Sequence, residues 1–435
     1  TLTSYSIEYY PTSYTIDGSS AVTFTSSDTP VTTLNGSTVS ALTETDTTTL
    51  ELSASRTRLA ADGTSQSTLT ATLHAADGTP VPDDTEVTFS TDGGTLSSTT
   101  ATTTDGSCSV TFTAPSTPQT VTVSASTSDA ADAIEIWCIG PPRSISLEAI
   151  PLDAPADGSA VSTITATLYD INGMTVLDGT PVTFSTDGGT LSSTNATTTD
   201  GSCSVTLKST EAKATTVTAT SGVATETVEV LFTPCAPSSI ELAIDPHDIV
   251  ADGTSSATVA VTVRDEHGNL VANGTEVTLS TTAGTLADST LTTTSGPAST
   301  TITSSTVAQD ATVTATCEGI EKTAIITFTP GPPATIEATP DAGTLPADGA
   351  STTIVSAYVQ DAQGNTVADG TIISFATSAG ALSSATAETT NGIASVTLTA
   401  ADTPQQIDVT ASVGDVTDTT QIVCVGPPVT IGLSA

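Results

Sequence analysis

Short runs in which apolar residues alternate with threonine or serine recur along the whole chain. Segments such as STITATLY (162–169) and SCSVTLK (202–208) place an apolar residue at every second position. This alternation is typical of antiparallel strands that have one buried face and one solvated face. The dipeptides DG, NG and GG separate the runs and supply residues that tight turns require. The pattern therefore predicts an all-β protein made of short antiparallel strands.

The strand pattern is itself repeated. The passage VTFSTDGGTLSSTTATTTDGSCSVT begins at Val87 and recurs at Val182 with one substitution. The motif ADG recurs at spacings of 95, 95 and 96 residues, with its aspartate at Asp62, Asp157, Asp252 and Asp348. A period near 95 suits an independent β-sandwich and is too long for a solenoid unit. We expect a partial β domain or assembly segment at 1–46, repeats at 47–140, 141–235, 236–331 and 332–426, and a C-terminal strand at 427–435.

Every repeat shows the same order of strand signals. In the second repeat these signals lie at 144–150, 162–170, 180–186, from Leu191 onward, and at 202–208, 215–221 and 226–233. Seven short strands in one repeat favour an immunoglobulin-like antiparallel sandwich. The linkers IGPP, TPCAP, TPGPP and VGPP are short and rich in proline, which restricts the joints between repeats. We therefore expect tandem immunoglobulin-like sandwiches in an elongated, semi-rigid rod.

The third and fourth repeats carry a family resemblance. The segments ADGTSSATVAVTVRDEHGNLVANGTEVTLSTTAGTL and ADGASTTIVSAYVQDAQGNTVADGTIISFATSAGAL resemble the bacterial immunoglobulin-like domains of the invasin and intimin type. The resemblance extends over about 47–427, and it implies rigid spacer domains of adhesins and other surface proteins. The sequence shows neither the lectin-like tip nor the outer-membrane barrel of the invasins. A role in receptor binding is therefore not implied, and any cell-surface or glycan ligand is unknown.

Composition narrows the function further. The 47 acidic and 7 basic residues give a formal net charge of −40, which excludes nucleic acid as a partner. No apolar run reaches the roughly 20 residues of a membrane helix, so we expect no direct membrane insertion. Enzyme signatures are missing: the histidines His74, His247 and His267 are scattered, and there is no GxSxG, phosphate loop or CxxC motif. We expect a non-enzymatic protein, located outside the cell or on its surface, that requires no cofactor.

The six cysteines suggest disulfides between repeats. If strands alternate up and down and repeats stack head to tail, Cys138 meets Cys203, and Cys235 meets Cys317. The two remaining residues, Cys108 and Cys424, then lie at opposite ends of the rod and could pair only between successive molecules. Free, buried cysteines are the alternative.

This pairing suggests self-assembly. The segment VTIGLSA near the C-terminus copies the first strand of a repeat and then stops, while the first 46 residues look like half a domain. In a head-to-tail homopolymer the terminal strand would complete the partial domain of the next subunit. The other explanation is that the sequence is an excerpt of a longer array, in which this strand begins a fifth repeat.

Acidic and amide residues supply two further candidates. Asp62, Asp92, Asp170, Asp178 and Asp200 are expected near repeat ends, where carboxylates could bind calcium, although Asp-Gly turns need aspartate without any metal. The sequons at Asn35, Asn195 and Asn273 are candidate glycosylation sites or ordinary turns.

Two functions follow from these features. The first is a structural subunit of an extracellular filament or surface appendage, which assembles head to tail through terminal strand addition and disulfides. The second is the stalk of a cell-surface adhesin whose binding tip lies outside this sequence.

Overall fold

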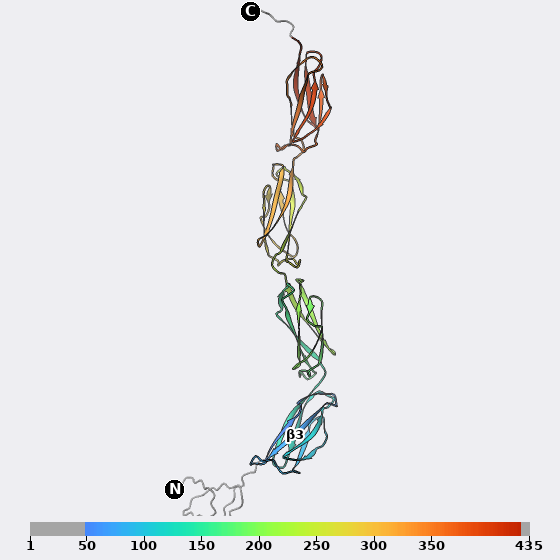
Figure 1. The fold of residues 1–435 in the computed structure, drawn as a ribbon, viewed down its shortest axis with the longest axis vertical. Helices are drawn as coiled ribbons and strands as arrows, with labels where there is room; N and C mark the ends of the chain where they lie inside the picture. Colours follow the sequence, from blue (N-terminus) through green and yellow to red (C-terminus); the bar gives the residue numbers. More distant parts are fainter. Residues whose placement is uncertain (1–47, 428–435) are drawn as a thin grey trace, which may run out of the picture.

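The computed structural model describes residues 48–427, and these form four β-sandwiches that follow one another along the long axis of a rod (Figure 1). The described residues contain strands and no helix, so they include no helix that is long and apolar enough to cross a membrane. The tandem immunoglobulin-like arrangement expected from the sequence is confirmed. The partial domain predicted at 1–46 and nearly all of the predicted terminal strand lie outside the described residues.

Each repeat contributes nine strands. Repeat 1 contains β1 (Thr49–Ala54), β2 (Arg58–Ala60), β3 (Gln66–His74), β4 (Glu86–Thr91), β5 (Thr95–Leu96), β6 (Thr100–Thr102), β7 (Ser107–Thr113), β8 (Gln119–Ser126) and β9 (Ala131–Ile139). Repeat 2 contains β10 (Ser144–Ile150), β11 (Asp153–Pro155), β12 (Ser162–Tyr169), β13 (Pro181–Thr186), β14 (Thr190–Leu191), β15 (Asn195–Thr197), β16 (Ser202–Lys208), β17 (Ala214–Ser221) and β18 (Ala224–Thr233).

The second half of the rod has the same elements. Repeat 3 contains β19 (Ser239–Asp245), β20 (Asp248–Val250), β21 (Ser256–Arg264), β22 (Glu276–Thr281), β23 (Thr285–Leu286), β24 (Thr290–Thr292), β25 (Ala298–Thr303), β26 (Gln309–Cys317) and β27 (Ile320–Thr329). Repeat 4 contains β28 (Thr335–Pro340), β29 (Thr344–Pro346), β30 (Thr352–Gln360), β31 (Ile372–Thr377), β32 (Ala381–Leu382), β33 (Thr386–Glu388), β34 (Ile393–Thr399), β35 (Gln405–Val413) and β36 (Val416–Val425).

Two sheets make up each sandwich. In repeat 2 the four-stranded sheet has the order β10-β12-β16-β14, and the five-stranded sheet has the order β11-β18-β17-β13-β15. The equivalent strands of the other three repeats follow the same order. All pairs are antiparallel except the short pair β11 and β18 and its equivalents, which are parallel.

The count of nine strands corrects the predicted seven. In every repeat the first strand signal is followed by a second short strand in the other sheet; in repeat 2 the break falls at Pro151, which has no N–H for the ladder of β10. The strand predicted from Leu191 is likewise divided into β14 and β15. Between them the Ser193 hydroxyl bonds both the N–H and the carbonyl of Asn195, which forms a local turn instead of a ladder.

Every repeat buries its own hydrophobic core. The cores are formed by the alternate residues of the strands, as in β12, where buried and half-buried residues alternate over its whole length. In repeat 2 the large members are Phe184 and Phe232, and no buried core cluster joins residues of two repeats. The repeats are therefore separate domains, and their relative placement depends on polar contacts at the joints.

Candidate functional site: the junctions between repeats

The contacts between repeats centre on one loop. This base loop comprises 170–174 in repeat 2, 265–269 in repeat 3 and 361–365 in repeat 4, and it faces the preceding repeat. It is a tight turn: in repeat 2 the Asp170 N–H donates to Met174 and the Gly173 N–H donates to Asp170. Gly173 has a φ of 78°, a conformation that glycine adopts without strain. The turn holds its first residue at the end of the domain.

That first residue is a buried aspartate at all three described joints. We call Asp170, Asp265 and Asp361 the junction aspartates; their exposed fractions are 2%, 3% and 2%. One carboxylate oxygen of each accepts two backbone N–H groups of its own loop. The other oxygen accepts the N–H of a linker residue that follows the last strand of the preceding repeat, at 3.0 Å from Gly140, 3.1 Å from Cys235 and 2.9 Å from Gly331.

This geometry favours the ionised carboxylate. Burial by itself raises the pKa of the Asp265 carboxyl, but hydrogen bonds from the Asn269 side chain and from backbone N–H groups outweigh burial and leave the pKa below its ordinary value. The same balance lowers the pKa of Asp361. A buried carboxylate is costly unless hydrogen bonds satisfy it, so each aspartate stabilises the docked arrangement in which the linker N–H is present.

A side-chain amide adds a second contact at two joints. In repeat 3 the Asn269 amide oxygen accepts the Ala212 N–H at 2.9 Å, and its nitrogen donates to the Thr210 carbonyl at 2.9 Å. Asn365 makes the same pair of bonds to the Ala308 N–H at 2.8 Å and the Thr306 carbonyl at 3.0 Å. We call the segment that receives the amide the end loop of a repeat; it precedes β8, β17, β26 and β35.

The joint between repeats 1 and 2 is built differently. Pro118 takes the place of Ala212 in the end loop and has no N–H to donate, and the repeat 2 base loop has Met174 at the amide position. Instead Asn172 donates to the Pro118 carbonyl at 2.8 Å. Arg58 adds hydrogen bonds to the carbonyl of Thr175, at 2.5 Å, and to its hydroxyl, at 3.0 Å.

The base loop of repeat 1 lacks both features. Ala75 stands where the other repeats have the junction aspartate, and Thr79 stands where repeats 3 and 4 have asparagine. Asp77 accepts the N–H and the hydroxyl of Thr79 within the same turn and is exposed. These hydrogen bonds lower the pKa of Asp77, so this loop satisfies its own carboxylate.

The predicted disulfides within the chain, Cys138 with Cys203 and Cys235 with Cys317, are not formed, and the pairing of Cys108 with Cys424 between molecules stays a prediction. All six cysteines are free thiols. The prediction considered which end of a strand each cysteine occupies, but not which face of the sheet its side chain lies on. Successive residues of a strand point to opposite faces, so Cys108 lies on the same face as Val110 and Phe112 and points into the repeat 1 core. Burial raises the pKa of the Cys138 thiol to about 11. The proposed partners Cys138 with Cys203, Cys235 with Cys317 and Cys108 with Cys424 belong to different domains, and Cys108, Cys138, Cys317 and Cys424 are buried in domain cores.

The five aspartates proposed for calcium are not gathered into one site. Asp170 is saturated by N–H donors, Asp178 accepts the Asp200 N–H, and Asp92 accepts the Thr122 N–H. Asp62 accepts three bonds from Thr64 and Ser65, which lower its pKa to about 2. Between residues 48 and 427 no group of three or more His, Cys, Asp and Glu side chains is arranged to hold a metal. The bonds of Asp62 belong to its own turn, while those of Asp92 and Asp178 join separate loops of one repeat.

The glycosylation candidates keep their status as predictions. Asn195 and Asn273 are exposed, and Asn35 lies outside the described residues. The scattered histidines His74, His247 and His267 come from different strands or loops of repeats 1 and 3.

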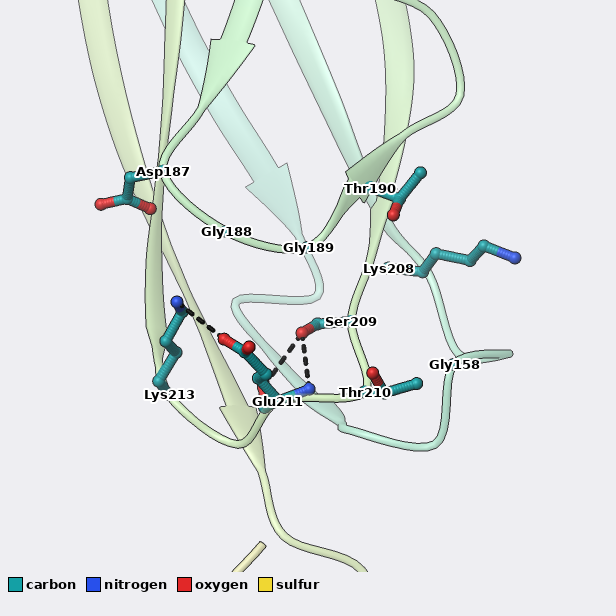
Figure 2. A pocket seen from close by; sticks show the side chains of 10 residues that line it. All are labelled: Gly158, Asp187, Gly188, Gly189, Thr190, Lys208, Ser209, Thr210, Glu211 and Lys213. Atoms are coloured by element: carbon teal, nitrogen blue, oxygen red, sulfur yellow. Dashed lines mark hydrogen bonds and ion pairs between the residues drawn. The ribbon is translucent and has the colours of Figure 1, made fainter. Parts of the chain in front are cut away.

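One depression of about 460 Å³ lies at the end of repeat 2, beside the end loop (Figure 2). Figure 2 shows Lys213 reaching Glu211, and the two form an ion pair of 2.8 Å. The Lys213 and Glu211 side chains are 44% and 69% exposed, and the Ser209 hydroxyl bonds only the backbone of Glu211. These contacts shape the end loop that Asn269 engages.

The junction function of these aspartates and amides was not predicted from the sequence. Only Asp170 was singled out, and for calcium, while Asp265, Asp361 and the amides of Asn269 and Asn365 were not considered. A signal was available, because repeat 1 keeps the glycine of the turn but has alanine at the aspartate position. An aspartate that the turn itself does not need indicates another partner.

Fold and junctions together define a tandem immunoglobulin-like repeat protein. The family model of invasin domain 3 matches residues 46–136, 236–331 and 333–426, and that of the bacterial Ig-like domain, group 1, matches 144–233. Because the first model covers more than half of the chain, the chain belongs to the invasin domain 3 family, as the sequence resemblance indicated.

Solved structures of similar proteins include an integrin-binding protein and an adhesin. Invasin, a bacterial integrin-binding protein, is 20% identical, with 86% of this chain and 79% of that chain covered and a TM-score of 0.41. The Escherichia coli adhesin FdeC is 21% identical, with 67% and 100% covered and a TM-score of 0.44. InvD of Yersinia pseudotuberculosis is 19% identical, with 64% and 97% covered and a TM-score of 0.38. No curated protein matches this chain.

Proposed function

We propose that this chain is the stalk of a cell-surface adhesin and holds a binding domain at a distance from the cell. The function is mechanical: it resides in the length of the rod and in the stiffness of its joints. Membership of the invasin domain 3 family supports the assignment, because such domains belong to adhesins and are in general not enzymes. An extracellular, surface-attached location is part of the proposal.

The observation that carries the proposal is the repeated junction aspartate. A flexible tether needs no contact between neighbouring domains, and a rod whose repeats share no core would otherwise bend at each linker. Here a buried carboxylate ties each base loop to the linker before it, at Gly140, Cys235 and Gly331. A stalk benefits from this arrangement because a stiff spacer keeps its reach.

The filament predicted from the sequence is the weaker candidate. Its covalent joint needs Cys108 and Cys424, and both thiols are buried in the cores of their own domains. A head-to-tail contact through repeat 1 would also meet Ala75 and Thr79, where the described joints use acid and amide groups. A joint between two molecules through repeat 1 would therefore lack the carboxylate and amide hydrogen bonds that stabilise the joints within the chain.

Small-angle X-ray scattering of the full chain tests the stalk. We expect a monomer whose maximum dimension equals that of the rigid rod and does not change with protein concentration. The matched variant replaces Asp170, Asp265 and Asp361 by alanine, and its scattering should indicate a shorter, flexible particle. Scattering of the unaltered chain that requires freely jointed domains would contradict the proposal, and mass that grows with concentration would favour a filament.

A further inference from the structure

The outer end of repeat 4 resembles the outer end of repeat 1 and differs from those of repeats 2 and 3. In the end loop, Pro404 occupies the position of Pro118, where repeats 2 and 3 have Ala212 and Ala308. Proline removes the N–H that an Asn269-type amide would need and leaves only a carbonyl. The end loop of repeat 4 can therefore accept a hydrogen bond at the Pro404 carbonyl, as the Pro118 carbonyl accepts one from Asn172.

A glycine packs against this proline in both repeat 1 and repeat 4. Gly140 follows the last strand of repeat 1 so closely over Pro118 that an added Cβ would lie 2.5 Å from the proline Cγ. Gly426 has the same relation to Pro404, at 2.9 Å. Gly331, after repeat 3, has no such neighbour, because its nearest atoms belong to Asp361 and Val250. The glycine and proline therefore form a matched pair at repeats 1 and 4.

Linker length gives an independent sign. Five residues separate Ile139 from Ile145, the first core residue of repeat 2, and five separate Val425 from Ile431. The corresponding linkers after repeats 2 and 3, 234–239 and 330–335, each contain six residues. The sequences IGPPRSI and VGPPVTI thus represent one kind of linker.

The last residue of the final strand is exposed in repeat 4, whereas the equivalent residue of repeat 1 is buried at the joint. Ile139 ends the last strand of repeat 1 and is 2% exposed beneath the joint, while the equivalent Val425 is 46% exposed. Repeats 2 and 3 have Thr233 and Thr329 at this position. Within residues 48–427 the Gly426 N–H and the Pro404 carbonyl have no hydrogen-bond partner. The face presents one apolar residue, one donor and one acceptor that the repeat 1 face uses for docking.

We propose that the outer end of repeat 4 docks a further immunoglobulin-like domain of the repeat 2 type, joined in tandem through residues 426–430. Its base loop carries aspartate at the first position, which accepts the Gly426 N–H, and asparagine at the third, which donates to the Pro404 carbonyl. The repeat 1 base loop of a second copy does not supply these groups, because it has Ala75 and Asp77 at these positions. The proposal goes beyond the stalk function by specifying which domain follows.

Two extended chains test this specificity. The first appends residues 150–235 after Ala435, which occupies the position of Ala149 and so completes a repeat 2 domain. The second appends residues 245–331 and completes a repeat 3 domain in the same way. The readout is hydrogen exchange of the Gly426 N–H, with Gly140, Cys235 and Gly331 as internal references in the same molecules.

Both appended domains carry the junction aspartate, so the difference must come from the end-loop contact: the Asn172 type donates to the Pro404 carbonyl, whereas Asn269 needs an N–H that Pro404 lacks. We therefore expect the Gly426 N–H to exchange about tenfold or more slowly in the first extended chain than in the second. Replacing the appended copy of Asp170 by alanine should abolish the difference, and replacing the appended copy of Ile171 by alanine should not. Equal exchange in both extended chains overturns the proposal, as does protection that appears only with a doubled mass in light scattering. If the three reference amides are also unprotected, the rigid stalk fails as well; if they are protected, only the present proposal fails.

Discussion

The base loops of repeat 1 and repeat 3 have the same shape and different chemistry. In repeat 1 the Ala75 N–H donates to Thr79 at 2.9 Å, and in repeat 3 the Asp265 N–H donates to Asn269 at 2.9 Å. The following glycine closes both turns in the same way. Since alanine supports the same turn, the aspartate is not needed to form it. The difference teaches that the carboxylate serves the neighbouring repeat.

Removing the carboxylate from repeat 3 should give the largest effect. In Asp265→Ala the linker N–H of Cys235 loses its acceptor, and the Asn269 side chain loses one of its own. We expect the free energy of opening this joint to fall by about 2–4 kcal/mol, the usual cost of truncating one partner of a buried, hydrogen-bonded charge. Hydrogen exchange of the Cys235 N–H measures it.

Two controls separate this effect from a general loss of charge. Asp77→Ala removes the exposed acid of the repeat 1 base loop, and Glu266→Ala removes an exposed acid beside Asp265. Both should change exchange at Cys235 by less than about 0.5 kcal/mol. If Glu266→Ala opens the joint as much as Asp265→Ala does, the carboxylate has no specific role.

Acid should open the joints less completely, because a protonated carboxyl still accepts some hydrogen bonds. The pKa values of Asp265 and Asp361 lie below that of an unfolded aspartate, about 3.9, so their stabilisation is complete above that pH and is lost as pH falls through the folded pKa. The rod should therefore stay stiff from pH 8 to 5 and loosen below about pH 4. Scattering measures the joints, and circular dichroism checks that the strands persist. Loosening near pH 6 would point to another group.

The amide contact should contribute less than the carboxylate. In Asn365→Ala the Ala308 N–H and the Thr306 carbonyl lose their partner, while the Asp361 bond to Gly331 remains. Two neutral hydrogen bonds suggest a loss of about 1–2 kcal/mol at this joint, read from exchange of the Ala308 N–H. The exposed neighbour Gln363, replaced by alanine, is the matched control. Unchanged exchange of the Ala308 N–H in Asn365→Ala would mean that the Asn365 amide does not stabilise the joint.

The smallest effect is expected at the first joint. Arg58 contacts Thr175 across the joint and lies 5.9 Å from the ring of Trp137, the only tryptophan of the chain. Arg58→Ala should cost about 1 kcal/mol there and alter tryptophan fluorescence, since both the hydrogen bonds and the cation–π contact are lost. Arg56→Ala should leave the fluorescence unchanged, because Arg56 bonds within repeat 1. Identical fluorescence spectra for both variants would mean that Arg58 does not contribute to the joint.

Alternation predicted most of the fold. The apolar parity of segments such as 162–169 and the spacing of the ADG motif are sufficient to recover the strands and the four repeats. Parity also places Cys108 and Cys138 inside their domain, but the disulfide prediction considered only which end of a strand each cysteine occupied. The two short strands around Ser193 could not be separated, because a serine turn and a serine-rich strand have the same composition.

The junctions were harder to predict for a physical reason. An aspartate at the first position of a tight turn is explained by that turn, so its second partner cannot be recognised until the linker of the preceding repeat is placed beside it. Comparison among the repeats supplies the missing signal, since Ala75 shows that the turn tolerates alanine.

The central claim is that neighbouring repeats are held as one body by the junction aspartates. Residual dipolar couplings of repeats 2 and 3, measured in the full chain at neutral pH, test it most directly. The account predicts one common alignment tensor for both repeats, which separates into two of unequal magnitude in Asp265→Ala. Two unequal tensors in the unaltered chain, or a common tensor that survives Asp265→Ala, would contradict it.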